Sequence, residues 1–412
     1  MDKQLLIRGE HKKVIIFYYK NNITININES KYNEIINWIN YDIKSDYIDK
    51  LSSYIGEQFL EALKVNKDDF LTESEKSLTL TSPINSYVAP TNMNIELTTR
   101  CPLRCPQCYC DLNRGKDINI DIAKKYIEQA SNLKIPYINL SGGETMVYPH
   151  LLELIKACSE YGLYSSIAIS GYGFNIYVLD KLINAGIGDI YVSLNGSNSK
   201  INSLTRDGFD LAIKALETLK NSKFKRYYIN WVAHENNITD ISNMVDLAKS
   251  YNVSKLIIIS FKPDSNYELK SVPSKEKFLY LANYIKKFKD NKLDIIIESC
   301  YSQLRAYVMN GYLFNANIGI EKGCGAARDG ISIDVDGNLT PCRHLEYHEK
   351  YEKINDYWNK SSILNEIRNA ENNVSEKCYN CKYSNNCLPC IAINSKLENK
   401  ICKNNSYCPL GN

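Results

Sequence analysis

The sequence predicts an α/β fold, because strand and helix patterns alternate six times between residues 94 and 310. Each strand pattern is a short run rich in β-branched and aromatic residues, and an amphipathic stretch such as 122–133 separates it from the next. Six such units favour a parallel sheet with helices outside, arranged as an open sheet or a partial barrel. The expected strands are 94–98, 137–140, 165–170, 189–194, 227–232 and 255–260.

A smaller unit precedes this region and spans residues 1–76. An apolar run over 14–19, turn residues and then isoleucines that alternate with polar residues over 23–27 predict a β-hairpin. Two helical patterns follow, and the second repeats every three or four residues over 48–63. Residues 77–93 contain two prolines and predict a linker to the α/β region.

The third region, residues 311–412, holds eight of the fourteen cysteines. Alternating apolar residues over 331–335 and the turn Asp336-Gly337 predict a hairpin, which would bring Cys324 and Cys342 toward one site. Two Cys-x2-Cys pairs follow, a pattern typical of zinc ribbons and of iron–sulfur sites. The other cysteines of this region are Cys378, Cys381, Cys387, Cys390, Cys402 and Cys408.

The composition narrows the class of protein. A net charge of +3 over 412 residues gives no reason to expect nucleic acid or a membrane as a partner. The first residues lack the apolar segment of a signal peptide, and no run of eighteen apolar residues occurs, so we expect a cytoplasmic protein. In that reducing compartment, many cysteines indicate metal binding rather than disulfides.

The run Cys-Pro-Leu-Arg-Cys-Pro-Gln-Cys gives the sharpest chemical signal. Its three cysteines, Cys101, Cys105 and Cys108, are separated by three and then two residues, which suits three irons of one [4Fe–4S] cube. The fourth iron then has no protein ligand, so it can bind a small molecule and pass it an electron. A structural zinc site is the alternative, but it needs four ligands, and only Cys110 is a local candidate for the fourth.

The second expected strand ends in Ser-Gly-Gly-Glu-Thr, which includes Gly142, Gly143 and Glu144. Two glycines allow a ligand to approach the backbone closely, and a glutamate can accept hydrogen bonds from an ammonium group. By itself the motif is more typical of a plain turn. Its place one β-α unit after the cysteine loop favours a binding site at the carboxyl ends of the strands.

Together these motifs resemble the radical S-adenosylmethionine (SAM) enzymes, with residues 94–109 matching their opening strand and cluster loop. In that family the open iron binds the amino and carboxylate groups of SAM, and an electron from the cluster cleaves SAM to a 5′-deoxyadenosyl radical. The resemblance implies a partial (β/α)6 TIM-like barrel. Gln107 stands where the family usually has an aromatic residue, and Tyr109 follows the third cysteine instead.

The resemblance also implies roles for residues around SAM. The Gly-Gly-Glu motif would bind the amino group, Ser170 the ribose and Arg206 the carboxylate. For Ser170 the alternative is a cap for the next segment, and for Arg206 it is a surface salt bridge. Asn195 stands where related enzymes often have an aspartate, so no catalytic acid or base can be assigned from the sequence.

The C-terminal cysteines resemble the SPASM extension of radical SAM enzymes, which holds two auxiliary [4Fe–4S] clusters. The chain has two residues after Cys387 where the usual pattern has three. The resemblance implies that Cys324, Cys342 and Cys390 serve the nearer cluster. Cys378, Cys381 and Cys387 would serve the outer one, with Cys408 or Cys402 as fourth ligand. The chain would then carry three [4Fe–4S] clusters, unless zinc occupies the C-terminal sites.

If Cys402 or Cys408 is free, the nearer cluster keeps an open iron that could bind a substrate thiolate. Two further cysteines lie outside these motifs. Cys158 falls within an amphipathic helix pattern, and Cys300 ends an apolar run, so both are expected to pack in the core.

The whole chain resembles ribosomal-peptide (RiPP) maturases that form thioether cross-links of the sactipeptide or ranthipeptide type. Its first unit would be a winged-helix-like module that binds a leader peptide, and its partners would be a cysteine-containing precursor peptide and an electron donor such as flavodoxin or ferredoxin. The alternatives are formylglycine-type sulfatase maturation and carbon–carbon or carbon–oxygen cross-linking. From another class of protein, the alternative is a non-catalytic iron–sulfur electron carrier or peptide-binding scaffold.

Overall fold

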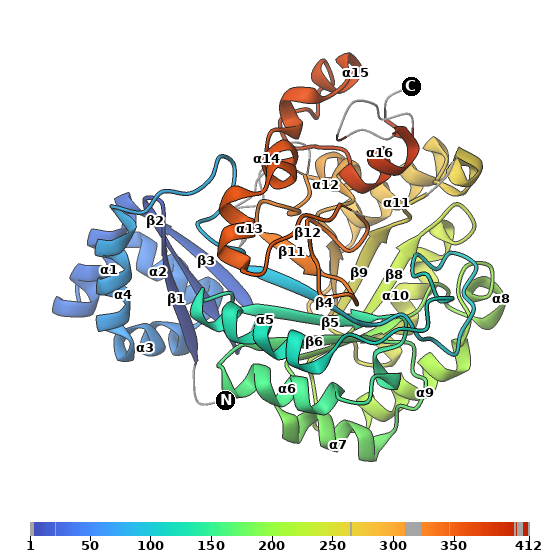
Figure 1. Ribbon diagram of the computed structural model, residues 1–412, viewed down its shortest axis with the longest axis horizontal. Coiled ribbons are helices and arrows are strands. Elements are labelled where there is room, and N and C mark those ends of the chain that lie inside the picture. The colour runs from blue at the N-terminus through green and yellow to red at the C-terminus, as the bar shows by residue number, and fades with distance from the viewer. Residues whose placement is uncertain are drawn as a thin grey trace.

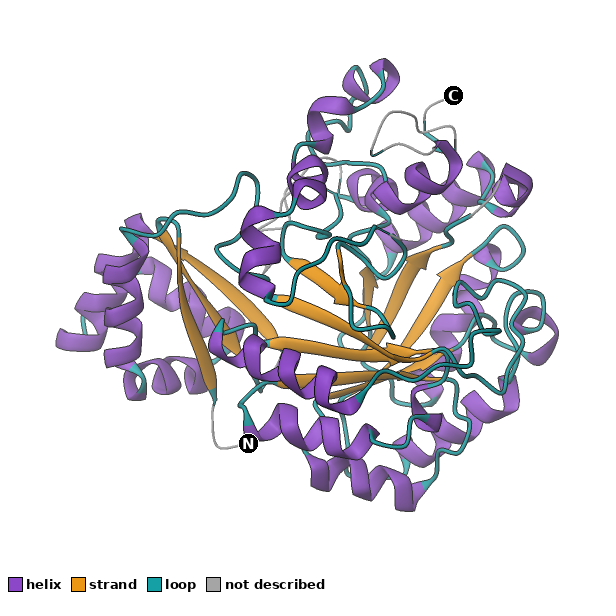
Figure 2. Cartoon of the chain, viewed as in Figure 1, coloured by secondary structure: helices purple, strands orange, loops and turns teal. Residues whose placement is uncertain are grey.

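The computed structural model describes residues 4–20, 22–263, 266–309, 323–345, 347–398, 401 and 407–410. Figure 1 shows an N-terminal module on the left, a central sheet wrapped by helices, and a C-terminal region above that sheet. The alternation of strands and helices is clear in Figure 2, where the helices lie on the outside of the curved sheet. Among the described residues, no helix has the length and apolar character needed to span a bilayer.

The central sheet has nine strands in the order β10-β9-β8-β7-β6-β5-β4-β11-β12. Strands β4 to β9 pair in parallel with their neighbours in chain order, which confirms the predicted α/β fold. These strands are β4 (Asn92–Thr98), β5 (Tyr137–Gly142), β6 (Tyr164–Ile169), β7 (Asp189–Ser193), β8 (Tyr227–Ala233) and β9 (Lys255–Ser260). The helices that connect them are α5 (Ile120–Asn132), α6 (Leu151–Glu160), α7 (Ile176–Ala185), α8 (Ser199–Asn202), α9 (Phe209–Lys220) and α10 (Ile241–Ser250).

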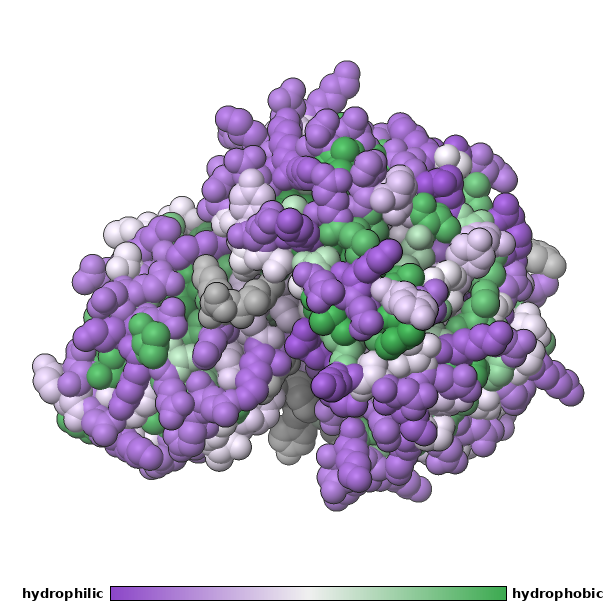
Figure 3. Space-filling view, turned by 90° about the horizontal axis from the view of Figure 1, so that it is seen from below, coloured by the Kyte–Doolittle hydropathy of each residue, from purple (hydrophilic) through white to green (hydrophobic). Residues whose placement is uncertain are grey.

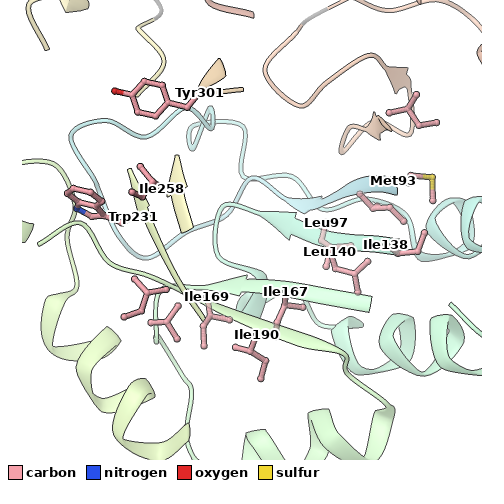
Figure 4. Close-up of a cluster of buried hydrophobic side chains, with 14 of the residues drawn as sticks. Met93, Leu97, Ile138, Leu140, Ile167, Ile169, Ile190, Trp231, Ile258 and Tyr301 are labelled. Carbon is pink, nitrogen blue, oxygen red and sulfur yellow. The ribbon is translucent and has the colours of Figure 1, made fainter. Parts of the chain in front are cut away.

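The main core lies between this sheet and its helices. Ile95, Ile138, Ile167 and Ile190, one from each of four neighbouring strands, are all fully buried in it. Figure 4 shows several of these side chains, together with Trp231 and Ile258 farther along the sheet. Alternate residues of each strand therefore face the helices, and the remaining residues line the inside of the curved sheet.

The sheet is longer than the sequence predicted at both ends. The run Ile295-Ile296-Ile297 forms β10 (Asp294–Ile297), which pairs in parallel with β9 after α11 (Lys275–Lys287). At the other end β11 (Gly330–Ile333) pairs in parallel with β4, and β12 (Leu339–Thr340) pairs with β11 as the expected hairpin. The first strands of the C-terminal region thus belong to the central sheet.

The N-terminal module is a three-stranded antiparallel sheet packed against four helices. Its strands β1 (Leu5–Glu10), β2 (Lys13–Tyr18) and β3 (Ile23–Asn28) lie in that order. The hairpin of β2 and β3 was predicted, but β1 was not, because all six of its residues are buried and no alternation marks it. The helices are α1 (Glu29–Tyr41), α2 (Asp46–Ile55), α3 (Glu57–Val65) and α4 (Lys67–Ser77).

The single helix expected over 48–63 is in fact two helices. Gly56 ends α2 and begins α3 with a φ of 103°, a conformation that L side chains rarely adopt. The apolar residues keep their spacing across the break, and Ile48, Phe59 and Leu63 are all fully buried in the module's own core. The periodicity therefore located the buried face correctly but missed the interruption.

The module packs against the amino-terminal ends of the barrel strands. Phe17 and Tyr19 form edge and stacked ring contacts with Tyr164, the first residue of β6. Arg8 is buried, forms an ion pair with Glu10, and donates hydrogen bonds to the carbonyls of Ala89 and Pro90. Figure 3 views the molecule from below, with the module as the left-hand lobe. A cleft of about 920 Å³ separates part of the two lobes, far from the cysteine loop after β4.

The C-terminal region continues in short helices above the sheet. They are α13 (Ile354–Lys360), α14 (Ser362–Arg368), α15 (Glu376–Tyr379) and α16 (Ile391–Glu398), and α12 (Ser302–Val308) precedes the region. Trp358 is fully buried, and its indole donates to the carbonyl of Tyr87 in the stretch that leads into β4. This contact attaches the C-terminal region to the start of the central sheet.

Candidate functional site

The site begins with the loop that follows β4, which carries Cys101, Cys105 and Cys108. The loop is anchored where it leaves the strand, because the Arg100 guanidinium forms two hydrogen bonds with Asp117, of 2.9 and 2.5 Å. The amide of Cys108 donates to the carbonyl of Cys105 at 3.1 Å, which closes a tight turn between the second and third cysteines. The sequence therefore folds the three cysteines into one short, anchored loop at the carboxyl end of a barrel strand.

The three thiols lie close enough to interact. Burial raises the pKa of Cys101, and the charges of Glu144, Cys105 and Cys108 raise it further. Hydrogen bonding to Cys110 lowers the pKa of Cys108 to about 6, which favours the thiolate, the form that binds metal.

No three His, Cys, Asp or Glu side chains within the described ranges are arranged to hold a single metal ion. The sulfurs around one tetrahedral zinc lie only about 3.8 Å apart, given a Zn–S bond of about 2.3 Å. A four-iron cube holds its thiolates farther apart than a single zinc ion does.

The Gly-Gly-Glu motif lies directly against this loop. The amide of Gly143 donates to the carbonyl of Thr98 at 2.7 Å, and that of Glu144 donates to the carbonyl of Arg100 at 2.9 Å. A Cβ atom on Gly142 would lie 2.5 Å from the Thr98 oxygen, and one on Gly143 would lie 2.4 Å from the Arg100 oxygen. The close approach of the β4 and β5 ends therefore requires glycine at both positions.

Glu144 is almost fully buried. One carboxylate oxygen accepts a hydrogen bond from the amide of Met146 at 3.1 Å, and the other accepts one from the amide of Ser170 at 2.8 Å. Burial raises the pKa of Glu144, although these hydrogen bonds and the charge of Arg206 oppose the shift. Each oxygen keeps acceptor capacity, so the carboxylate can still bind a cationic group.

Ser170 and Arg206 both lie near the Glu144 carboxylate. The hydroxyl of Ser170 accepts a hydrogen bond from the amide of Tyr172 at 3.3 Å, which is the capping role that the sequence left open. The Nε atom of Arg206 is buried and has no hydrogen-bond partner among the described residues, although its charge acts on Glu144 and Cys108. A buried, unpartnered guanidinium donor beside the cysteine loop fits the carboxylate of an amino acid.

The segment that carries Arg206 is also tied to the loop. The carboxylate of Asp207 accepts a hydrogen bond from the amide of Arg104 at 2.9 Å. Asn195 supports the segment from behind, because its side chain donates to Thr205 at 3.1 Å and accepts from the amide of Val232 at 3.1 Å. Asn195 therefore has a structural role here. Its hydrogen bonds connect the end of β7 to β8 and to the segment that carries Arg206.

Sequence reasoning missed the side chains that face the inside of the barrel. Glu96 on β4 is one of them, and burial raises its pKa while the charge of Arg343 lowers it. The thiol of Cys110 lies 3.8 Å from the Glu96 carboxylate and 3.5 Å from the Gly142 carbonyl. The alternation of Asn94, Glu96 and Thr98 with apolar residues in β4 could have identified this face.

Arg343 and His344 bring the C-terminal region to the same place. The guanidinium of Arg343 stacks over the ring of Tyr109 with its central carbon 4.4 Å from the ring centre, and the rings of His344 and Tyr109 are 4.5 Å apart. Burial lowers the pKa of Arg343 to about 10. A small cavity between the two regions is lined by residues that include Gln107, Lys262 and Lys396.

The C-terminal cysteines fall into two groups. Burial raises the pKa of Cys324, and the charges of Cys390 and Cys342 raise it further, so the three thiols predicted for the nearer cluster lie together. Burial likewise raises the pKa of Cys387 to about 12, with contributions from the other members of the second group. Those members are Cys408, Cys378 and Cys381. Cys402, the other candidate for the fourth ligand of the outer cluster, lies outside the described residues.

Comparison with known proteins identifies the domain that contains the cysteine loop. Residues 95–248 match the radical SAM superfamily. A PqqA peptide cyclase from Methylorubrum extorquens (strain PA1) is 30% identical over 191 residues, which are 42% of this chain and 47% of that protein. The mycofactocin maturase MftC from Mycolicibacterium smegmatis is 23% identical over 316 residues, which are 73% of this chain and 77% of that protein.

The fold has a counterpart among solved structures. SuiB from Streptococcus suis, bound to S-adenosylmethionine, superposes with a TM-score of 0.70 at 18% identity, over 100% of both chains. SuiB bound to its precursor peptide SuiA gives a TM-score of 0.71 over 100% of this chain and 99% of SuiB, also at 18% identity.

The match to the superfamily shows that this chain contains a radical SAM domain, as the resemblance of residues 94–109 predicted. The chain spans about half the length of the PqqA peptide cyclase that it matches.

Proposed function

We propose that this chain is a radical SAM maturase of a ribosomally made peptide. The observation that carries the proposal is that two side chains of opposite charge lie beside the cysteine loop. They are the buried carboxylate of Glu144 and the guanidinium of Arg206, whose Nε has no hydrogen-bond partner among the described residues. An amino acid has an ammonium and a carboxylate on one carbon, and these two side chains offer the complementary charges. SAM carries such an amino-acid group.

In this proposal Cys101, Cys105 and Cys108 hold a [4Fe–4S] cluster, and Glu144 and Arg206 orient SAM on its open iron. Ser170, whose amide already donates to Glu144, would meet the ribose. The cluster and SAM together supply one-electron chemistry that removes a hydrogen atom from the substrate.

The modification that we expect is a thioether between a substrate cysteine and a carbon of another residue. An S–H and a C–H bond break and a C–S bond forms. The hydrogen atom from carbon leaves in 5′-deoxyadenosine, the thiol proton goes to solvent, and one electron must be accepted. Two auxiliary [4Fe–4S] clusters of a SPASM domain would accept it, and the two groups of C-terminal thiols support such clusters.

The N-terminal module is proposed to bind the leader of the substrate as a winged-helix-like element. Strand β1 is covered by α4, because the amide of Gly9 donates to Glu73 at 2.5 Å and that of Lys12 donates to the carbonyl of Ser77 at 3.1 Å. Strand β3 pairs only with β2 within the described part of the sheet. Its free edge could accept an extended peptide as a fourth strand, with affinity from backbone hydrogen bonds.

Reaction of the anaerobically reconstituted protein with SAM, reductant and candidate precursor peptides tests the proposed function. We expect 5′-deoxyadenosine, and a peptide that is lighter by two hydrogens and has one fewer thiol that iodoacetamide can alkylate. Loss of two hydrogens with all thiols intact would point to carbon–carbon or carbon–oxygen cross-linking. Conversion of a cysteine to formylglycine would point to sulfatase-type maturation. No SAM cleavage by protein with full clusters would favour an electron carrier or scaffold.

Leader binding can be tested separately, by fluorescence anisotropy with labelled leader peptides. Methylation of the amides on one edge of an extended leader should abolish binding if that edge pairs with β3. Methylation of the alternate amides should leave binding largely unchanged. Equal affinity of both methylated peptides would contradict strand addition.

A further inference from the structure

Arg343 brings a set of unused hydrogen-bond donors to the site. Its guanidinium carbon lies 4.4 Å over the ring of Tyr109, directly after the third cysteine of the loop. The Nε atom is buried, and no hydrogen bond or ion pair joins the guanidinium to any other described residue. The charge of Arg343 acts on Glu96, but the two side chains form no ion pair with each other. A guanidinium has five N–H donors, so a ligand with acceptor atoms is needed to use them.

Arginines that hold the fold together have different surroundings in this chain. Arg8 donates to the carbonyls of Ala89 and Pro90. Arg226 donates to two further carbonyls at the other end of the barrel, and Arg368 donates to one in the C-terminal region. Each of these guanidinium groups is fixed by the backbone of another segment. Arg343 has no such partner among the described residues, so a role in tying segments together does not explain it.

A small cavity opens beside the same tyrosine ring. It gives about 30 Å³ of room to water-sized groups, and Gln107, Tyr109 and Lys262 are among the residues that line it. The side-chain oxygen of Gln107 is buried and has no hydrogen-bond partner among the described residues. Buried polar groups are normally hydrogen-bonded, so the unpaired amide marks a place that a polar ligand or water completes.

Positive charge predominates around this cavity. Lys262 lines it from the carboxyl end of β9, and Lys396 lines it from α16. Arg343 adds a third cation above the Tyr109 ring. Glu268 is the one acid among the described lining residues, and it takes part in an interaction of its own. A negatively charged group is therefore the ligand that this place favours.

Counter-charge for an iron–sulfur cluster is the simpler explanation of these cations. It accounts for positive charge near the cysteines, but it needs no directed hydrogen bonds and no neutral amide. The unpaired guanidinium of Arg343 and the unpaired amide of Gln107 both offer donors with a direction. A carboxylate, which has two acceptor oxygens, uses such donors fully.

We propose that Arg343, with Lys262 and Gln107 beside it, forms a subsite that binds a carboxylate of the peptide substrate. This inference rests on the proposed function, because it takes the ligand to be the peptide. The guanidinium donates a bidentate pair of hydrogen bonds to the carboxylate, next to the cysteine loop. An acidic side chain and a C-terminal carboxyl group share this chemistry. The subsite thus selects a peptide with an acidic group near the residue that is modified.

Binding of synthetic peptides to the anaerobically reconstituted protein, with SAM present and no reductant, tests the subsite. The first probe is acetyl-Ala-Cys-Gly-Asp-Ala-amide, and the second has Asn in place of Asp. The third is acetyl-Ala-Cys-Gly-Ala with a free C-terminal carboxylate. We expect at least one carboxylate probe to bind about tenfold or more tighter than the Asn probe, and the tighter of the two identifies its source. Equal affinity of all three probes, or no detectable binding, would overturn the proposal.

Variants assign the preference to Arg343. Arg343→Gln should remove it, and Arg343→Lys should keep only part of it, because lysine loses the planar pair of donors. Arg226→Gln is the matched control and should keep the full preference, since Arg226 lies at the other end of the barrel. SAM affinity of Arg343→Gln should stay within about twofold of wild type. A tenfold loss would instead assign Arg343 to the carboxylate of SAM and overturn the proposal.

Chemical modification tests the unaltered protein, in case the variants fold poorly. Phenylglyoxal reacts with free guanidinium groups, so mass spectrometry should find Arg343 modified in the reconstituted protein. The carboxylate probe that binds should slow this reaction several-fold, whereas the Asn probe should not. An unchanged rate at Arg343 in the presence of the carboxylate probes would contradict the subsite.

The proposed function can fail separately. SAM cleavage in the presence of reductant reports on the radical chemistry, whatever Arg343 binds. Normal SAM cleavage with equal binding of the three probes would make only the subsite wrong. Selective binding of a carboxylate probe without SAM cleavage would make the maturase proposal wrong and leave a peptide-binding protein with an acidic preference.

Discussion

The side-chain amide of Asn22, in the turn between β2 and β3, donates a 2.7 Å hydrogen bond to the carboxylate of Asp189. Asp189 is the first residue of β7 and is fully buried at the amino-terminal end of the barrel. The hydroxyl of Tyr164 donates to the same carboxylate at 2.5 Å. A charged group of the barrel is thus satisfied in part by the N-terminal module, which orients one relative to the other.

We predict that Asp189→Ala destabilises the protein by about 2–4 kcal/mol, because it leaves buried hydroxyl and amide donors without an acceptor. Asn22→Ala should cost only about 1 kcal/mol, since the tyrosine hydrogen bond remains. Denaturant unfolding of both single variants and the double variant measures the coupling. If the two effects simply add, the contact between Asn22 and Asp189 contributes nothing.

Arg206→Lys should weaken SAM binding about tenfold or more. Lysine keeps the charge but loses the planar pair of donors that matches a carboxylate. Isothermal titration of the reconstituted protein with SAM measures the change. Arg226→Lys is the matched control, because Arg226 donates to the carbonyl of Gly188 at the other end of the barrel. Equal affinities of the two variants would exclude a contact of Arg206 with SAM.

Gly143→Ala should disrupt the site although it adds one methyl group. The new Cβ would lie 2.4 Å from the Arg100 carbonyl, so the cysteine loop or the Gly-Gly-Glu turn must shift. We expect lower iron content after reconstitution and a large loss of SAM affinity. Gly173→Ala is the control, because a Cβ there meets no atom within 4 Å, although its φ of 67° adds some strain. Normal SAM binding by Gly143→Ala would contradict the packing argument.

Glu96→Gln should separate SAM binding from peptide modification. Glu96 faces the inside of the barrel near Arg343 and Cys110, and it is not among the hydrogen-bond partners of Glu144, which are Met146 and Ser170. Iron content and SAM affinity should stay within about twofold, whereas the rate of peptide modification should fall about tenfold or more. Mass spectrometry of the peptide and chromatography of 5′-deoxyadenosine measure the two outputs. The exposed Glu128→Gln on α5 is the control.

The pH dependence of stability should change in Asp329→Asn. Burial raises the pKa of Asp329 to about 6 in the folded protein, from an ordinary value of 3.8. The contribution of this group is therefore fully present below about pH 4 and is lost as the pH rises through about 6. The asparagine variant lacks this loss, so its melting temperature should rise relative to wild type between pH 4 and 7. A constant difference between the two proteins would show that Asp329 has an ordinary pKa.

Local patterns predicted the six barrel strands well, because each is a short apolar run with an amphipathic helix after it. They failed for β1, because all of its residues are buried and its sequence therefore does not alternate between apolar and polar residues. The break at Gly56 was missed because the apolar spacing continues across it. The parallel pairing of β11 with β4 depends on contacts between distant parts of the chain, which no local pattern contains.

The candidate site, too, was predicted where its signal is local and missed where it depends on contacts between distant parts of the chain. The spacing of Cys101, Cys105 and Cys108 was enough to predict a cluster loop, since its chemistry is local. Arg343 and His344 belong to no motif, and they contact Tyr109 from a distant part of the chain, so only the fold places them at the site. Glu96 could have been found from the alternation within β4.

The pairing of β4 with β11 also bears on how the chain is made. A ribosome completes β4 and its cysteine loop long before it reaches Gly330–Ile333, the residues that cover the outer edge of that strand. The nascent barrel therefore presents an unpaired edge during most of its synthesis, which exposes it to association with other chains. The same interval leaves the cysteine loop uncovered by Arg343 and His344, so the delivery of iron and sulfide can precede closure of the site by the last quarter of the protein.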